Sequence, residues 1–285
     1  MSGALTIAGY ALRESMRRRV FVVVLLLTAA FLALYAVGAN AAFDSIDAQA
    51  AGAAFNVDDQ VLTGSTLLGL AMFTTLFLGC VLAVFLTLGA VRGDAERGLL
   101  QPLVVRPLGR TALLGGRFGA AAGVCGLYVA GVYAAATLIT GWAGGWWPDD
   151  PVGPGVGLVV GVMIIAALSL LGSIFLSATA NGIAVFMAFG AGLAAGLLGQ
   201  IGDALDVDTL KNIAQIASWA LPFEALYQSG LDSLTSGAEG TTAVIVQLGP
   251  FGGAQEAGPL LWPWTVAYLA LLAATARVAF ARRDL

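Results

Sequence analysis

Long apolar stretches alternate with shorter polar segments from one end of the chain to the other. Six stretches are long and apolar enough to be assigned as spans, approximately residues 20–37, 66–91, 113–140, 155–177, 183–201 and 260–280. About 20 consecutive apolar residues in a helix cross a hydrocarbon layer of roughly 30 Å. The pattern therefore predicts an all-α polytopic membrane protein with six transmembrane helices, forming a single transmembrane domain over residues 1–285.

Two other regions carry helical patterns that do not suit a full crossing. Residues 1–19 repeat apolar side chains at helical spacing beside four arginines, which predicts an N-terminal amphipathic helix at the membrane interface. The region 202–259 contains a semi-apolar segment that Pro222 interrupts. We expect a broken re-entrant or interfacial helix pair there, on the outer side before the last span.

Charged residues are scarce and separated by sign along the chain. Only 11% of the residues are charged, against about 25% in soluble proteins. Every basic residue except Lys211 lies in residues 1–19, 92–117 or 277–283. Only four acids lie in these segments or at the chain end: Glu14, Asp94, Glu96 and Asp284. Because cytoplasmic loops carry an excess of arginine and lysine, we predict a multi-pass protein of the cytoplasmic (inner) membrane with both termini in the cytoplasm.

The segment Arg92–Arg117 holds five of the thirteen basic residues and lies between two spans. Within it, Asp94–Val105 is predicted to form a short amphipathic helix whose apolar face comprises Leu99, Leu100, Leu103 and Val104. Such a helix on a cytoplasmic loop is suited to contact with a soluble partner. The alternative is that the arginines serve only as a topology signal.

The sequence lacks the usual patterns of catalytic and metal-binding sites. It contains no histidine, and its one lysine, Lys211, does not belong to a phosphate-binding loop. We therefore predict no catalytic residue, no metal, no cofactor held by this chain and no nucleic-acid partner. The predicted spans contain almost no ionisable groups, so the energy for any transport would have to come from elsewhere, most simply from a partner ATPase. Cys80 and Cys125 lie inside apolar runs, which favours buried thiols over a disulfide.

Small residues recur at four-residue spacing in the fifth predicted span. Ala188, Gly192 and Gly196 fall on one helix face and allow another helix backbone to approach closely. Two interpretations remain open: Gly192 and Gly196 form a dimer interface, or the face packs against a neighbouring helix of the same subunit.

Several motifs occur in a characteristic order. The basic stretch Arg13–Arg19 precedes the first span, and Leu221-Pro222-Phe223 precedes the last. The loop reads Asp94-Ala95-Glu96-Arg97-Gly98-Leu99-Leu100, then Arg106-Pro107-Leu108-Gly109-Arg110 and Gly116-Arg117, and the chain ends in Arg282-Arg283-Asp284-Leu285. Over its whole length the chain resembles the ABC-2 type permeases, the membrane subunits of type-2 ATP-binding-cassette exporters. Arg117 stands where lysine is usual in that family.

The resemblance implies a homodimer of permeases that moves a substrate across the membrane, with ATP bound and hydrolysed by a separate subunit. It implies that this ATPase docks on the N-terminal helix and the Asp94–Val105 helix, and that the coupling residues are Arg13, Arg17, Glu96, Arg97, Leu99 and Leu100. Two alternatives stay open: an accessory permease for maturation of an extracytoplasmic metalloenzyme, and a membrane anchor or signalling protein without transport. The sequence does not identify the substrate.

Overall fold

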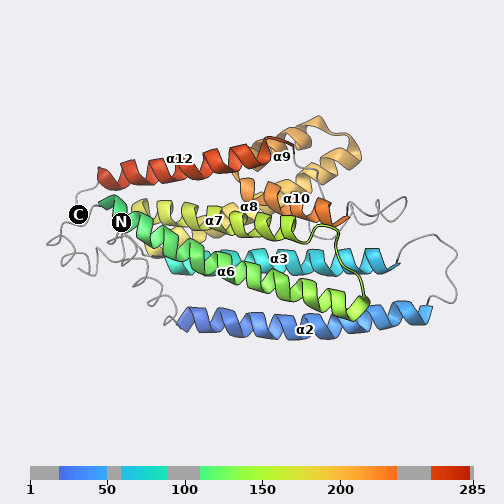
Figure 1. Cartoon of the computed structure of the whole chain (residues 1–285). Helices are drawn as coiled ribbons and strands as arrows, with labels where there is room; N and C mark the ends of the chain where they lie inside the picture. Colours follow the sequence, from blue (N-terminus) through green and yellow to red (C-terminus); the bar gives the residue numbers. More distant parts are fainter. Residues whose placement is uncertain (1–18, 50–58, 89–109, 236–257, 283–285) are drawn as a thin grey trace.

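The computed structural model describes residues 19–49, 59–88, 110–235 and 258–282. These residues are helical almost throughout, and no strand occurs among them. The helices are α2 (Arg19–Gln49), α3 (Asp59–Thr87), α6 (Arg110–Gly144), α7 (Val152–Phe175), α8 (Ala178–Leu205), α9 (Asp208–Ala220), α10 (Pro222–Thr235) and α12 (Leu261–Ala281) (Figure 1). Six of them, all but α9 and α10, are long and apolar enough to cross a membrane, which confirms the predicted all-α fold with six spans.

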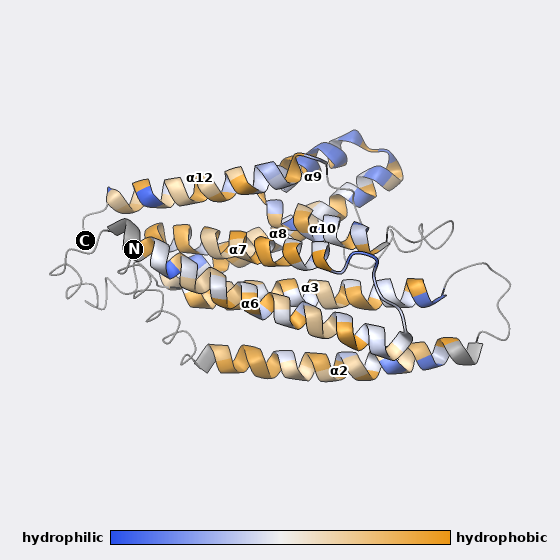
Figure 2. Ribbon diagram, in the orientation of Figure 1, coloured by the Kyte–Doolittle hydropathy of each residue, from blue (hydrophilic) through white to orange (hydrophobic). Residues whose placement is uncertain are grey.

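The six long helices lie side by side and alternate in direction, so that α2 begins and α12 ends at the same end of the bundle (Figure 1). This end carries the arginines of the described side chains and is hereafter called the basic end. They are Arg117, Arg277 and Arg282. The opposite end, hereafter the acidic end, carries Asp44, Asp59, Asp149, Asp150 and Asp203. The hydropathy colouring shows apolar helix bodies, with the polar residues concentrated around α9 (Figure 2).

Helices α3 and α7 form the centre of the bundle. In their apolar windows 61% and 56% of the residues are buried, against 17% in α2 and 22% in α12, which lie at the periphery. Close contact at the centre depends on Gly79 of α3, where an added methyl group would lie 2.8 Å from Val162 of α7 and 2.9 Å from Val129 of α6. At the basic end, α12 packs through Ala276 and Phe280 on a smaller apolar cluster that includes Leu114 and Leu170.

Several helices extend beyond the predicted spans. The first was expected to end at residue 37, but α2 continues through Gly38 to Gln49, and α3 covers residues 59–87 instead of 66–91. A glycine inside a helix costs only about 1 kcal/mol relative to alanine, so Gly38 does not stop α2. Apolar length marks where a helix crosses the hydrocarbon, whereas the helix itself can continue into the polar region on either side.

Residues 178–182, where the dipeptide Asn181-Gly182 favours a tight turn in the sequence, are helical instead. Only Leu176 and Ser177 separate the end of α7 from the start of α8 at Ala178, and Asn181 and Gly182 lie in the first two turns of α8. The Ser177 side chain accepts a hydrogen bond of 3.4 Å from the backbone N–H of Ala180 and caps the helix. The Asn-Gly pair suggested a turn, but the cap at Ser177 and the burial of Asn181 favour the helix.

Two helices occupy the segment for which a broken pair was predicted. Helix α9 ends at Ala220, and α10 starts at Pro222, whose missing N–H is tolerated in a first helical turn. Helix α9 has no buried residue, whereas α10 buries Phe223, Leu226 and Tyr227 against the long helices at the acidic end (Figure 1). A re-entrant or interfacial position of this pair in a bilayer stays a prediction.

Candidate functional site

The predicted coupling residues lie outside the part of the chain that the structure describes. This applies to the N-terminal helix with Arg13 and Arg17, and to the Asp94–Val105 segment with Glu96, Arg97, Leu99 and Leu100. The structure does describe the helices to which that segment is joined. Helix α3 ends at Thr87, and α6 begins at Arg110, both at the basic end.

A buried polar network connects three helices at this end. The Thr87 hydroxyl lies 2.7 Å from the Ser169 hydroxyl of α7, to which it donates, and the Asn181 side-chain amide of α8 donates to the Ser169 carbonyl at 2.8 Å. All three residues are at most 1% exposed. Hydrogen bonds between membrane helices contribute about 0.6 kcal/mol on average and at most about 1.7 kcal/mol. The network therefore holds the last turn of α3 to α7 and α8, directly before residues 89–109.

Helix α2 is held to α6 by two hydroxyl pairs. The Thr28 hydroxyl lies 2.5 Å from the Tyr128 hydroxyl, and the Tyr35 hydroxyl lies 2.6 Å from the Thr140 hydroxyl. Elsewhere much of α2 is exposed, including Leu26 at 65%. These polar pairs position a peripheral helix that buries little apolar surface within the subunit.

The small-residue face of α8 contacts α10 of the same chain. A methyl group on Gly192 would lie 2.7 Å from the Phe223 ring, and a methyl group on Gly196 would clash with the polar ends of Glu224 and Gln228. Phe223 also stacks on Phe189 of α8, with ring centroids 5.7 Å apart. Packing within one subunit thus explains the glycines at these two positions, and a dimer interface through Gly192 and Gly196 stays a prediction.

Glu224 is a buried carboxyl that the sequence analysis did not identify. Its side chain is 3% exposed, and its Oε1 accepts a 3.1 Å hydrogen bond from the Gln228 side-chain amide. Its Oε2 is buried and has no hydrogen-bond partner among the described residues. Burial raises the pKa of the Glu224 carboxyl to about 8, despite the opposing effect of the Gln228 hydrogen bond. The only feature of the sequence that could have indicated this buried carboxyl is a single acid in the semi-apolar segment around Pro222.

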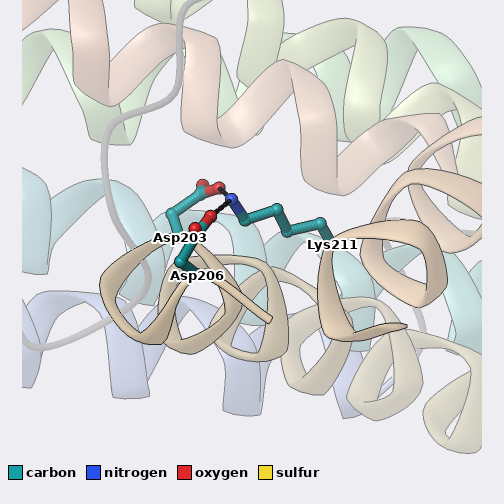
Figure 3. Close-up of polar contacts among 3 residues, drawn as sticks. All are labelled: Asp203, Asp206 and Lys211. Atoms are coloured by element: carbon teal, nitrogen blue, oxygen red, sulfur yellow. Dashed lines mark hydrogen bonds and ion pairs between the residues drawn. The ribbon is translucent and has the colours of Figure 1, made fainter. Parts of the chain in front are cut away.

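An ion-pair cluster joins the end of α8 to the start of α9 (Figure 3). The Lys211 ammonium lies 2.8 Å from Asp206 Oδ1 and 3.8 Å from Asp203 Oδ1. The hydrogen bond between Lys211 and Asp206 raises the pKa of Lys211 and lowers the pKa of Asp206. Asp206 itself has a positive φ of 51° and ends α8 in the left-handed conformation. Because the cluster is exposed, it contributes little to stability and mainly fixes the direction in which α9 leaves α8.

Aromatic residues attach the far end of α9 to α12. The Trp264 ring N–H donates to the Trp219 carbonyl at 2.9 Å, and the Tyr268 hydroxyl donates to the Ala220 carbonyl at 2.8 Å. These bonds satisfy carbonyl groups at the C-terminus of α9. Trp264 and Tyr268, near the start of α12, therefore hold the C-terminus of α9 against α12.

The described residues contain no group of three or more histidine, cysteine, aspartate or glutamate side chains that could hold a metal ion. Cys80 and Cys125 are both free and fully buried, as predicted for small apolar core residues.

A comparison with protein families matches residues 5–285 to a model described as ABC-2 family transporter protein. A search of curated proteins finds no match.

Proposed function

The chain belongs to the ABC-2 transporter family, and from this premise we propose that it is the permease subunit of an ATP-binding-cassette exporter. The permease moves a substrate across the cytoplasmic membrane, and a separate subunit binds and hydrolyses ATP. We propose further that two permeases form a homodimer. The observation that carries the proposal is the family match over residues 5–285. The six apolar helices of the bundle agree with it.

We place the basic end of the bundle in the cytoplasm. Arginine-rich segments are retained on the cytoplasmic side of a membrane, and the arginines and aspartates of the described helices gather at opposite ends. In this orientation both termini are cytoplasmic, and the segment between α3 and α6 is accessible to an ATPase.

We propose that the Asp94–Val105 segment transmits the movement of the ATPase to α3. This helix is central to the bundle, so a displacement of its basic end also displaces its neighbours. The Thr87–Ser169–Asn181 network supports this route, because it connects the last turn of α3 to α7 and α8. Helix α7 in turn packs against α10, where the backbone carbonyl of Leu226 would lie 3.2 Å from a methyl group on Gly157. A path of direct contacts therefore leads from the basic end to the outer helix pair.

Leu99 and Leu100 are proposed as the apolar part of the contact with the ATPase. Burial of a leucine side chain contributes about 1.5–3 kcal/mol, and clustered apolar anchors dominate many interfaces. Glu96 near the start of the predicted helix complements the positive end of the helix dipole, which contributes about 0.3–1 kcal/mol. Arg13, Arg17 and Arg97 supply positive charge to the same proposed contact.

The test is the double change Leu99→Ala with Leu100→Ala. The matched control is Leu25→Ala with Leu26→Ala, which alters two neighbouring leucines on the exposed face of α2. We expect the first variant to insert normally but to lose co-purification of the ATPase or transport-linked ATP hydrolysis, while the control retains both. If assembly and ATP-driven export survive the Leu99–Leu100 change unaltered, this segment is not the coupling element.

A further inference from the structure

A cavity of about 200 Å³ lies between α8, α9 and α10 at the acidic end. Small residues of α8, among them Gly196 and Gly199, form one wall, and Glu224 and Gln228 of α10 form another. The α9 wall includes the Lys211 side chain, beside Asp203 of α8. The lining therefore combines a buried carboxyl, the Lys211–Asp203 ion pair, neutral polar side chains and small apolar groups.

Glu224 is the unusual group in this lining. A carboxylate removed from water requires a compensating partner, either a proton or a cation. The Gln228 amide satisfies Oε1 only, and Oε2 has no partner within the described part of the chain. The absence of a side chain at Gly196 leaves room for the two polar ends, since a Cβ atom there would collide with both.

The surrounding charges favour a cation over an anion. Asp203 and Lys211 line the same cavity and form an ion pair, so the charge of Lys211 is already compensated. Helix α7 carries no titratable side chain. Helices α3 and α12 carry four, none of which lines the cavity: Asp59, Cys80, Tyr268 and Arg277. An ionised Glu224 would therefore leave one negative charge without a counter-charge.

The ligand set suits an ammonium group better than a divalent metal ion. Calcium takes six to eight oxygen ligands and magnesium six, and the described residues contain no group of three acidic, cysteine or histidine side chains that could hold a metal ion. A primary ammonium group needs only a few acceptors and offers three N–H donors.

We propose that this cavity binds a primary ammonium group, with the carboxylate of Glu224 as its acceptor and Gln228 holding that carboxylate in place. The same chemistry is offered by a small free amine and by the ethanolamine headgroup of a phospholipid. This proposal goes beyond the exporter function and requires no ATPase. Binding is measured on the permease alone, so its failure would leave the proposed coupling to an ATPase untouched.

The first experiment uses the full-length permease in phosphatidylglycerol nanodiscs and amine-free buffer, with radiolabelled ethylamine as the probe. We expect saturable binding that Glu224→Gln weakens at least tenfold. Asp44→Asn is the matched control, because it makes the same change at an exposed carboxyl of α2 and should bind like the wild type. Glu224→Asp keeps the charge but withdraws the carboxylate by one methylene, so intermediate binding is expected.

The second experiment separates the two sources of the ammonium group. Nanodiscs containing phosphatidylethanolamine are compared with nanodiscs containing phosphatidylcholine, whose headgroup has no N–H donor. If phosphatidylethanolamine competes with ethylamine and phosphatidylcholine does not, the lipid headgroup is a ligand. If neither lipid competes, the ligand is a free amine. Absence of ethylamine binding to the wild type, or equal binding to Glu224→Gln, would overturn the proposal.

The pH dependence gives an independent measurement. Protons compete with the ammonium group for Glu224, whereas ethylamine stays protonated to about pH 10, as lysine does. With the pKa of Glu224 at about 8, affinity should increase roughly 90-fold between pH 6 and pH 9, in proportion to the ionised fraction. The same affinity at both values would contradict a role for this carboxylate.

Discussion

Glu224 should make the stability of the folded protein decrease as the pH rises. The pKa of its carboxyl is about 8 in the folded state, compared with an ordinary value of 4.5. Between these two values the folded state binds more protons than the unfolded state, so each increase in pH favours unfolding. The contribution is fully present below pH 4.5 and is lost as the pH rises to about 8.

The size of the effect follows from the same two values. One pKa unit corresponds to about 1.4 kcal/mol. With a shift from 4.5 to about 8, the loss of unfolding free energy between pH 5.5 and pH 9 is roughly 3 kcal/mol. No large reduction for solvent screening is needed, because the side chain is only 3% exposed.

Reversible unfolding in mixed micelles, followed by circular dichroism in amine-free buffer, measures this difference. Glu224→Gln keeps the shape of the side chain but cannot ionise, so we expect its profile to lack the loss of roughly 3 kcal/mol that the wild type shows. Asp44→Asn should follow the wild type. Parallel profiles for wild type and Glu224→Gln would refute the reasoning and show that the buried carboxyl does not determine the pH dependence.

Three further predictions concern topology and packing. Gly98→Cys and Ser236→Cys, each in a background without Cys80 and Cys125, should react with an impermeant thiol reagent from opposite sides of the membrane; labelling of both from outside would contradict the topology. Ser169→Ala should lower the unfolding free energy by about 1 kcal/mol because it removes an interhelical acceptor, whereas Ser173→Ala removes only a bond to the Leu170 carbonyl of its own helix and should cost less. Gly192→Leu should destabilise the subunit by about 1–3 kcal/mol through overpacking against Phe223, whereas Gly190→Leu, with open space around it, should stay within about 0.5 kcal/mol of the wild type. Equal unfolding free energies for the two glycine variants would contradict this packing.

The sequence was sufficient for the fold class because apolar length is a direct physical requirement of crossing a membrane. Six stretches met that requirement, and the described part of the chain contains six such helices. Helix ends were predicted less well, because they depend on caps and not on hydropathy. Ser177, for example, caps the start of α8 just before an Asn-Gly pair that resembled a turn.

Side-chain environments could not be predicted from a single sequence. The sequence placed Glu224 only in the broken helix pair expected on the outer side, since nothing in its neighbourhood indicates that α10 packs on the glycine face of α8. The spacing of Gly192 and Gly196 did predict a close helix contact, but it left open which helix would make it. The structure identifies α10 as one partner of that face.

Hydrolysis of ATP by the purified assembly tests most directly whether the chain is the membrane subunit of an ATP-driven exporter. The tagged permease is isolated from its own membrane with its bound subunits, placed in liposomes, and assayed before and after those subunits are stripped. We expect hydrolysis by the assembly, none by the stripped permease, and recovery when the ATPase is added back. A permease that carries no ATP-hydrolysing subunit, or that hydrolyses ATP after stripping, would contradict the proposed function.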